Sequence, residues 1–208
     1  MKKTNNYNGI AWCYDFLASL VFKGNILKSQ RAFLNTIPSN SQILWIGGGS
    51  GKVLPQLLDP TRQLRIDYLD TSEKMLLKAK KIAHTSNGCD RIQFILGDHT
   101  KIPNKKYDVV LTYFFLDLFD KDKGALIFDS LNSSLKNGGL WLYADFTPTK
   151  RKKYQFLEKI MFWFFTRYTN IESSKIEAHT PLFKASFSLQ MSAEFNDRYI
   201  VSSVYQKM

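Results

Sequence analysis

The sequence has few of the residues that build disulfide scaffolds or metal sites. It contains two cysteines, Cys13 and Cys89, and three histidines in 208 residues. The cysteines lie far apart and no Cys-x-x-Cys occurs, which excludes a disulfide scaffold and favours two small buried thiols in a reducing compartment. The histidines are scattered, so we expect no metal site.

Long apolar runs, repeats and low-complexity tracts are also missing. No segment approaches the ~20 apolar residues of a membrane span. The basic start, Met1-Lys2-Lys3, is followed by polar residues rather than by the apolar stretch of a signal peptide, so we expect a cytoplasmic location. A chain of 208 residues that is 44% hydrophobic fits one folded domain.

Acidic residues are outnumbered. The chain has 29 lysines and arginines against 18 aspartates and glutamates, a formal net charge of +11. Such an excess suggests an anionic partner, whether nucleic acid, an acidic lipid surface or an acidic ligand, although it also serves solubility.

Short apolar runs do occur, and they alternate with helical patterns. Such runs suit buried parallel strands, and we expect strands over residues 43–46, 64–69, 92–96, 107–113 and 139–146. Helices are expected after a cap at Thr71 or Ser72, and from Ala125 to Leu135, where Asn137-Gly138-Gly139 ends the second one. Strands alternating with helices predict an α/β fold with a mostly parallel sheet.

Three segments depart from that alternation. Residues 186–191 and 199–205 alternate like strands around a turn at Asn196-Asp197, which predicts a terminal antiparallel hairpin. Residues 8–37 carry two expected helices, Ile10 to Phe22 and Ile26 to Ile37. Residues 147–182 form a long excursion. Both outlying segments are placed to cover the carboxyl ends of the strands, where open α/β sheets bind ligands.

The glycine-rich turn after the first strand is the strongest motif. Ile43-Leu44-Trp45-Ile46 runs into Gly47-Gly48-Gly49-Ser50-Gly51, and a helix pattern follows. Glycines allow a ligand to approach the main chain, and the helix N-terminus adds free N–H groups. Lys52 breaks the dinucleotide fingerprint, and the P-loop spacing is absent.

Acidic residues follow the next two strands. Asp70 ends the second strand, where a carboxylate can accept both hydroxyls of a ribose. Asp98, in Gly97-Asp98-His99, can accept from an adenine amino group. Alternatively, Asp70 caps a helix and Asp98 is a polar loop residue. The three motifs after successive strands are more specific than any one of them.

Together these motifs resemble those of the class I S-adenosylmethionine-dependent methyltransferases. The resemblance covers about residues 40–146 and includes Tyr107-Asp108-Val109-Val110 and Leu135-Lys136-Asn137-Gly138-Gly139. It implies a Rossmann-like seven-stranded sheet of order 3-2-1-4-5-7-6, helices on both faces and an antiparallel last strand. It also implies S-adenosylmethionine as cofactor, with contacts from Gly47, Gly48, Gly49, Gly51, Asp70, Thr71, Met75, Asp98, His99 and Thr112.

One position departs from the family. Two residues before the first glycine, the family often has an acidic residue that helps hold the cofactor's amino group, whereas this chain has Trp45. That change puts cofactor affinity in question and keeps a catalytically inactive binding protein as an alternative.

The resemblance divides the single domain into four parts. We expect an N-terminal helical cover over residues 1–40, a cofactor-binding core over 41–146, a lid or substrate segment over 147–182 and a terminal hairpin over 183–208. The leading segment around Tyr14 resembles that of quinone-biosynthesis methyltransferases. The Tyr14 ring either lies over the sulfonium, since an aromatic ring attracts a nearby cation, or packs in the core from an amphipathic helix.

The methyl acceptor is expected at the end of the fourth strand, Thr112 to Asp117. The Asn/Asp-Pro-Pro-Tyr/Phe motif of amino-methylating DNA enzymes is absent there, and neither cysteine is placed for cytosine carbon methylation. Methyl transfer needs a positioned nucleophile and sometimes a base. Tyr113 and Asp117 are candidates for that base. The simpler alternatives are that the Tyr113 ring packs in the core and that Asp117 caps a helix.

Residues 150–168 combine six basic residues and one acid with many aromatics. This pattern is typical of an interfacial helix at a membrane surface, or of phosphate contacts with base stacking on RNA, or of aromatics buried on the sheet beside solvated lysines.

Taken together, the motifs predict methyl transfer to a small, apolar or aromatic acceptor, with an RNA methyltransferase as the alternative. The sequence identifies neither the methylated atom nor the oligomeric state.

Overall fold

The computed structural model describes residues 24–86, 88–159 and 176–208. The expected helix from Ile10 to Phe22, including Tyr14, and most of the aromatic run after Ile160 lie outside the described residues.

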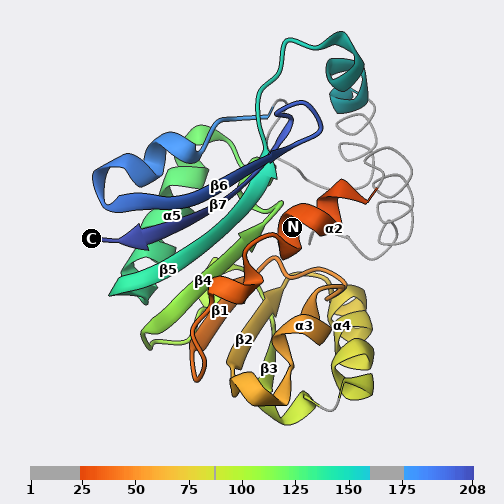
Figure 1. The fold of residues 1–208 in the computed structure, drawn as a ribbon, viewed down its shortest axis with the longest axis vertical. Helices are drawn as coiled ribbons and strands as arrows, with labels where there is room; N and C mark the ends of the chain where they lie inside the picture. Colours follow the sequence, from red (N-terminus) through yellow and green to blue (C-terminus); the bar gives the residue numbers. More distant parts are fainter. Residues whose placement is uncertain (1–23, 87, 160–175) are drawn as a thin grey trace, which may run out of the picture.

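A seven-stranded sheet forms the centre of the molecule (Figure 1), in the order β3-β2-β1-β4-β5-β7-β6. Strands β1 to β5 pair in parallel, and β7 runs antiparallel to both β5 and β6. Both the predicted order and the antiparallel last strand are confirmed. The bounds are β1 Gln42–Ile46, β2 Arg65–Asp70, β3 Ile92–Leu96, β4 Tyr107–Tyr113, β5 Leu135–Phe146, β6 Phe187–Phe195 and β7 Ile200–Lys207.

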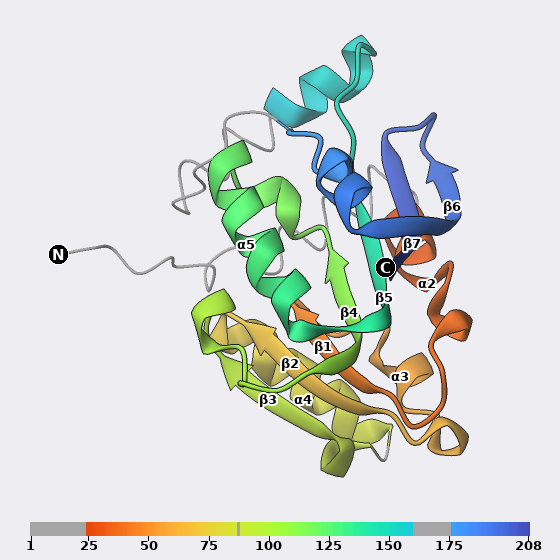
Figure 2. The same ribbon diagram turned by 90° about the vertical axis from the view of Figure 1, so that its left-hand side faces the viewer.

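Helices cover both faces of the sheet (Figure 2), because most central strands bury side chains on each side. One apolar cluster joins Trp45 and Tyr68 to residues of the helices α2 (Asn25–Arg31), α3 (Leu54–Leu57) and α4 (Glu73–Thr85). On the opposite face, Phe128 of α5 (Lys121–Ser134) packs with Trp141 and with Phe183 of η7 (Thr180–Ala185).

Side-chain caps set the starts of the two long helices. Ser72 Oγ accepts from the N–H of Met75 and begins α4, and Asp120 does the same for Lys123 and begins α5. The other short helices are η2 Leu34–Thr36, η3 Pro60–Arg62, η4 Cys89–Arg91, η5 His99–Lys101 and η6 Leu116–Leu118.

Some boundaries differ from those predicted. Helix α5 ends at Ser134, and β5 begins at Leu135 with an irregular register, so the glycines expected to stop the helix lie within the strand. The expected helix from Ile26 to Ile37 divides into α2 and η2. Helix α3 is only four residues long: the proline in its first turn is tolerated there, but Pro60 begins η3 shortly after its end.

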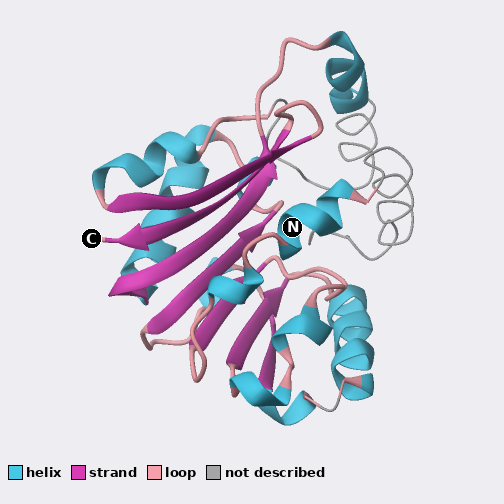
Figure 3. Ribbon diagram, in the orientation of Figure 1, coloured by secondary structure: helices cyan, strands magenta, loops and turns pink. Residues whose placement is uncertain are grey.

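The hairpin turn is longer than the predicted pair of residues (Figure 3), with turn structure over 196–199. Asn196, Asp197 and Arg198 all have positive φ, at 51°, 55° and 72°. The turn lies at the end of the sheet that also holds the carboxyl ends of β4 and β5, because Phe195 and Ile200 pair beside Phe146.

Candidate active site

The glycine loop after β1 has a shape that other residues would strain. Gly47, Gly49 and Gly51 have φ of 66°, 62° and 76°, in the left-handed region. A Cβ on Gly47 would lie 2.5 Å from Cδ2 of Phe115, and one on Gly51 would lie 2.6 Å from Leu54. Internal packing therefore accounts for Gly47 and Gly51.

Gly48 and Gly49 differ from each other in their surroundings. A Cβ on Gly48 would lie 2.2 Å from Cζ of Tyr68, whose hydroxyl donates to the carbonyl of Gly49 at 2.9 Å. A Cβ on Gly49 would meet nothing within 4 Å. Gly49 is thus the glycine of this loop that has open space beside its Cα.

Asp70 ties the loop to the end of β2. One carboxylate oxygen accepts from the N–H of Gly49 and the other from the N–H of Ser72, both at 2.8 Å. Burial raises the pKa of the Asp70 carboxyl above its ordinary value, while these two N–H groups oppose that shift. The helix cap is Ser72 rather than Asp70, which leaves Asp70 bound to the loop.

A carboxylate offers about four acceptor positions, so Asp70 retains roughly half of them for a ligand. Its neighbours Thr71, which is exposed, and Met75, which is half-buried, lie at the start of α4. These residues and the open backbone of Gly49 form one continuous stretch at the carboxyl ends of β1 and β2.

Asp98 follows β3 and caps η5. Its Oδ1 accepts from both the N–H and the hydroxyl of Thr100, at 2.9 and 2.6 Å, and these bonds lower the pKa of Asp98. His99 begins η5 and is half-buried. Asp98 thus has the loop-capping role that the sequence left open, on an exposed residue that a ligand can reach.

Three expected site positions lie in the core. Trp45 is 1% exposed, and its ring contacts Tyr68 and Tyr113 at centroid distances of 5.0 and 5.9 Å. Burial raises the pKa of the Tyr113 phenol, so its hydroxyl is no base near neutral pH. Thr112 Oγ1 accepts from the indole N–H of Trp141 at 2.8 Å, which occupies the Thr112 side chain.

The chain turns sharply where β4 ends. Phe114 has φ of 53°, a strained value for a large side chain, and its N–H donates to the carbonyl of Ala144 at 2.7 Å. Its ring packs on Phe146 at 4.9 Å, while Phe115 covers Gly47. Aromatic rings therefore line the end of β4 next to the glycine loop.

Asp117 lies directly beyond, in η6, and the structure pairs it with Asp145 at the end of β5. The two side chains are hydrogen-bonded to each other, and both residues are buried, at 8% and 1% exposed. Burial raises the pKa of Asp117 to about 6. Sequence reasoning missed Asp145, although an acid at the end of an apolar strand is the same signal that identified Asp70.

The described part of the basic segment is attached to the hairpin turn. Residues 152–159 are helical. Arg151 and Lys153 form ion pairs with Asp197 at 2.9 and 2.7 Å, and the Tyr154 hydroxyl donates to the same carboxylate at 3.3 Å. Tyr154 also stacks on Tyr199 at 4.4 Å. Two of the four residues in the basic tetrad thus bind the chain's own acid.

Within the described ranges, no group of three metal-ligating side chains comes together. No helix there is long and apolar enough to cross a membrane. The open backbone at Gly49 and the remaining acceptor positions of Asp70 fit a ligand with vicinal hydroxyls, such as a nucleoside. Trp45 offers no acceptor for an ammonium group, so that part of the family's site is absent.

Comparison with known proteins points to one family. Residues 43–139 match the family model described as "Methyltransferase domain". A curated relative, Malonyl-[acyl-carrier protein] O-methyltransferase 2 of Ilyobacter polytropus, is 32% identical over 148 residues, which are 70% of this chain and 54% of that protein. The chain therefore spans about half the length of this relative.

Solved structures show the same fold at low identity. An O-methyltransferase family 2 protein from Planctomyces limnophilus, in complex with apigenin, has a TM-score of 0.66 and 17% identity, covering 91% of this chain and 60% of that one. Magnesium protoporphyrin IX methyltransferase from Synechocystis, with bound S-adenosylhomocysteine, has a TM-score of 0.65 and 16% identity, covering 88% and 82%.

Proposed function

Because the chain is a class I S-adenosylmethionine-dependent methyltransferase through its residues 43–139, we propose that it transfers a methyl group from S-adenosylmethionine to a small apolar or aromatic acceptor. The observation that supports this most is the hydrogen bond from the N–H of Gly49 to Asp70. It joins an open stretch of backbone to a carboxylate that still has acceptor positions.

The cofactor, when bound, supplies an activated methyl group on a sulfonium. We expect Gly47, Gly48, Gly49 and Gly51 to hold it along the loop, and Asp70 to accept from the ribose hydroxyls. We expect Thr71, Met75, Asp98 and His99 to surround the nucleoside, with only main-chain contact available from Thr112. The remaining task of the protein is to position the acceptor and exclude water.

The acceptor site follows from the end of β4. The ring of Phe115 covers Gly47 of the loop, and the ring of Phe114 packs on Phe146, so aromatic side chains at this end of the sheet suit a flat or apolar acceptor. Relatives bearing O-methyltransferase names favour oxygen as the methylated atom. Asp117 is our candidate for the group that receives the acceptor's proton, whereas buried Tyr113 serves packing. Tyr14 is a further candidate, from the segment that we expect to cover the cofactor.

Calorimetric titration with S-adenosylhomocysteine tests the cofactor assignment. We expect saturable binding by the wild type, and weakening by about 1–3 kcal/mol in Asp70→Ala, because the ribose hydroxyls lose an acceptor. Asp90→Ala, on exposed η4, is the matched control and should bind as the wild type does. Absence of binding at near-millimolar ligand would overturn the proposal.

A further inference from the structure

Asp117 and Asp145 meet where β4 and β5 end, and their environments are unequal. The main-chain N–H groups of Asp117 and Phe146 donate to the two oxygens of Asp145, at 3.2 and 3.0 Å. The hydroxyl of Tyr143 donates to Asp145 as well. Even so, burial and the neighbouring Asp117 carboxyl raise the pKa of Asp145 well above its ordinary value, whereas the hydrogen bond from Asp145 lowers that of Asp117, so the proton of the pair belongs on Asp145.

Asp117 has one oxygen to spare. Its Oδ1 is buried and has no hydrogen-bond partner among the described residues. A buried acceptor without a partner is uncommon in folded proteins and calls for a donor that comes from elsewhere. Because Asp145 and Asp117 are hydrogen-bonded to each other, the two carboxyls share a single proton and carry a single negative charge.

We propose that this carboxyl pair is the proton acceptor for a neutral hydroxyl substrate, with Asp117 receiving the proton and Asp145 acting as its positioning residue. The inference rests on the proposed methyl transfer and deepens it. A hydroxyl group donates to the free Oδ1 of Asp117, whereas a carboxylate acceptor would bring a second negative charge to a pair that already carries one.

The transfer balances without any further reactant. The acceptor oxygen bonds to the methyl carbon, and the electron pair of the broken carbon–sulfur bond stays on sulfur. The hydroxyl proton passes to Oδ1 of the Asp117 carboxylate, while Asp145 keeps its own proton. The pair becomes neutral as the sulfonium charge is lost, so charge is conserved.

Other titratable groups near the pair stay in one state around neutral pH. Burial raises the pKa of Tyr143 on β5 and of Tyr205 on β7, so both phenols remain neutral. Burial lowers the pKa of His179 by more than the nearby carbonyls of Leu116 and Phe119 raise it, so its ring too is neutral. The pair is then the group that titrates here.

Infrared spectroscopy of the free protein tests the shared proton without any cofactor. We expect the wild type to show the C=O band of a protonated carboxyl at neutral pH. Asp117→Asn and Asp145→Asn should each abolish it, while Asp129→Asn, which changes an exposed acid on α5, should retain it. A wild-type spectrum without that band would overturn the proposal.

Acceptor preference tests the function of the pair. A naphthol and the corresponding naphthoate, offered with S-adenosylmethionine, should differ at least tenfold in favour of the naphthol. Asp117→Asn should lower kcat for the naphthol by roughly 10²–10⁴-fold. Asp145→Asn should displace the acid limb of its pH profile and leave KM unchanged.

Preference for the naphthoate or for a malonyl thioester, or full turnover by Asp117→Asn, would overturn the inference. Calorimetry with S-adenosylhomocysteine distinguishes the two failures. If the wild type binds S-adenosylhomocysteine but does not prefer the naphthol, only the role of the carboxyl pair is contradicted. If the wild type does not bind S-adenosylhomocysteine, the proposed function is contradicted.

Discussion

Gly48 and Gly49 are adjacent, but the structure assigns them different reasons for being glycine. A Cβ at Gly48 collides with the buried ring of Tyr68, which has no room to retreat, whereas a Cβ at Gly49 enters open space. Gly48→Ala should therefore destabilise the fold by about 1–3 kcal/mol. Gly49→Ala should cost about 1 kcal/mol, from its positive φ alone.

Ligand affinity should show the reverse order. Gly49→Ala places a methyl group where the cofactor is expected, so its affinity for S-adenosylhomocysteine should fall by tenfold or more. Thermal denaturation and calorimetry on both variants check this. If Gly49→Ala binds as tightly as the wild type, the ligand does not approach the loop at Gly49.

The buried carboxyl pair also predicts a pH dependence of stability. Burial raises the pKa of Asp117 to about 6, so the folded chain holds a proton that the unfolded chain releases near its ordinary pKa of 3.8. The free energy of unfolding must then fall as pH rises between those values, and continue to fall while Asp145 stays protonated in the fold. Asp117→Asn should flatten this slope, which unfolding in urea from pH 4 to 7 measures.

A rise in wild-type stability over that range relative to Asp117→Asn would contradict the assignment. The expected difference is on the order of 1–3 kcal/mol, since both groups are fully withdrawn from water. Asp129→Asn serves again as the control, because that exposed carboxyl should titrate alike in both states.

Residue types at strand ends carried most of what the sequence could predict about the site. Asp70 was identified because it ends the second strand and Asp117 because it follows the fourth, and both prove to be hydrogen-bonded there. Thr112 could not be judged in advance, since its bond to Trp141 spans two strands. The pairing of Asp145 with Asp117 required the register of β4 against β5.

Among the elements, the helix over 152–159 contacts the hairpin turn through one carboxylate, Asp197, and through the stack of Tyr154 on Tyr199. Arg151, Lys153 and Tyr154 all contact Asp197 in a turn of strained backbone. Asp197→Ala should release the helix while changing global stability by less than about 1 kcal/mol, because exposed ion pairs contribute little. Hydrogen exchange should rise at 152–159 and remain unchanged in α5.

Salt should mimic the substitution, because exposed pairs are screened. Exchange at 152–159 in the wild type should therefore approach that of Asp197→Ala as the salt concentration rises. Exchange rates that are equal in the two proteins at low salt would show that stacking of Tyr154 on Tyr199 suffices to hold the helix.

Element order was more predictable than element length. Alternating apolar runs and helical patterns defined the strands, and two of them match to the residue, β3 and β4. The ends of α5 and β5 were not predictable because the register shift between Tyr107 and Val109 depends on the neighbouring strand. Local sequence does not determine such pairing between distant strands.

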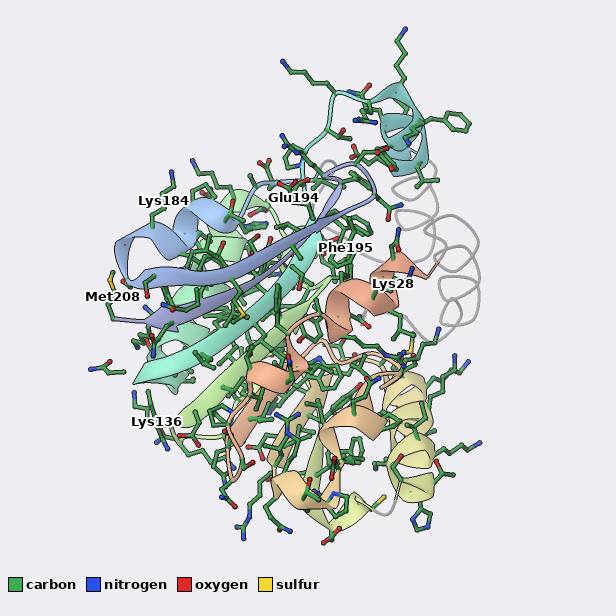
Figure 4. All side chains as sticks on the ribbon, in the orientation of Figure 1. Lys28, Lys136, Lys184, Glu194, Phe195 and Met208 are labelled. Carbon is green, nitrogen blue, oxygen red and sulfur yellow. The ribbon has the colours of Figure 1, made fainter. Side chains whose placement is uncertain are left out.

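At the scale of the whole molecule, the charge of +11 comes from the basic residues of 150–168 and from lysines on several other elements. Figure 4 shows Lys136 and Lys184 toward the end of the sheet opposite Glu194, while Lys28 lies on α2. Several cations bind the chain itself. Lys106 and Lys207 donate to carbonyls at the end of α5, which stabilises the helix terminus.

This distribution bears on the RNA alternative. Binding driven by scattered lysines depends on counterion release, so retention on structured RNA should fall steeply between about 50 and 200 mM salt. Binding of S-adenosylhomocysteine relies on Asp70 and backbone groups of the loop, so its affinity should change less than about twofold over the same range. Filter retention and calorimetry in one salt series compare the two. RNA binding that persists at high salt would indicate a built RNA site and favour RNA as the methyl acceptor.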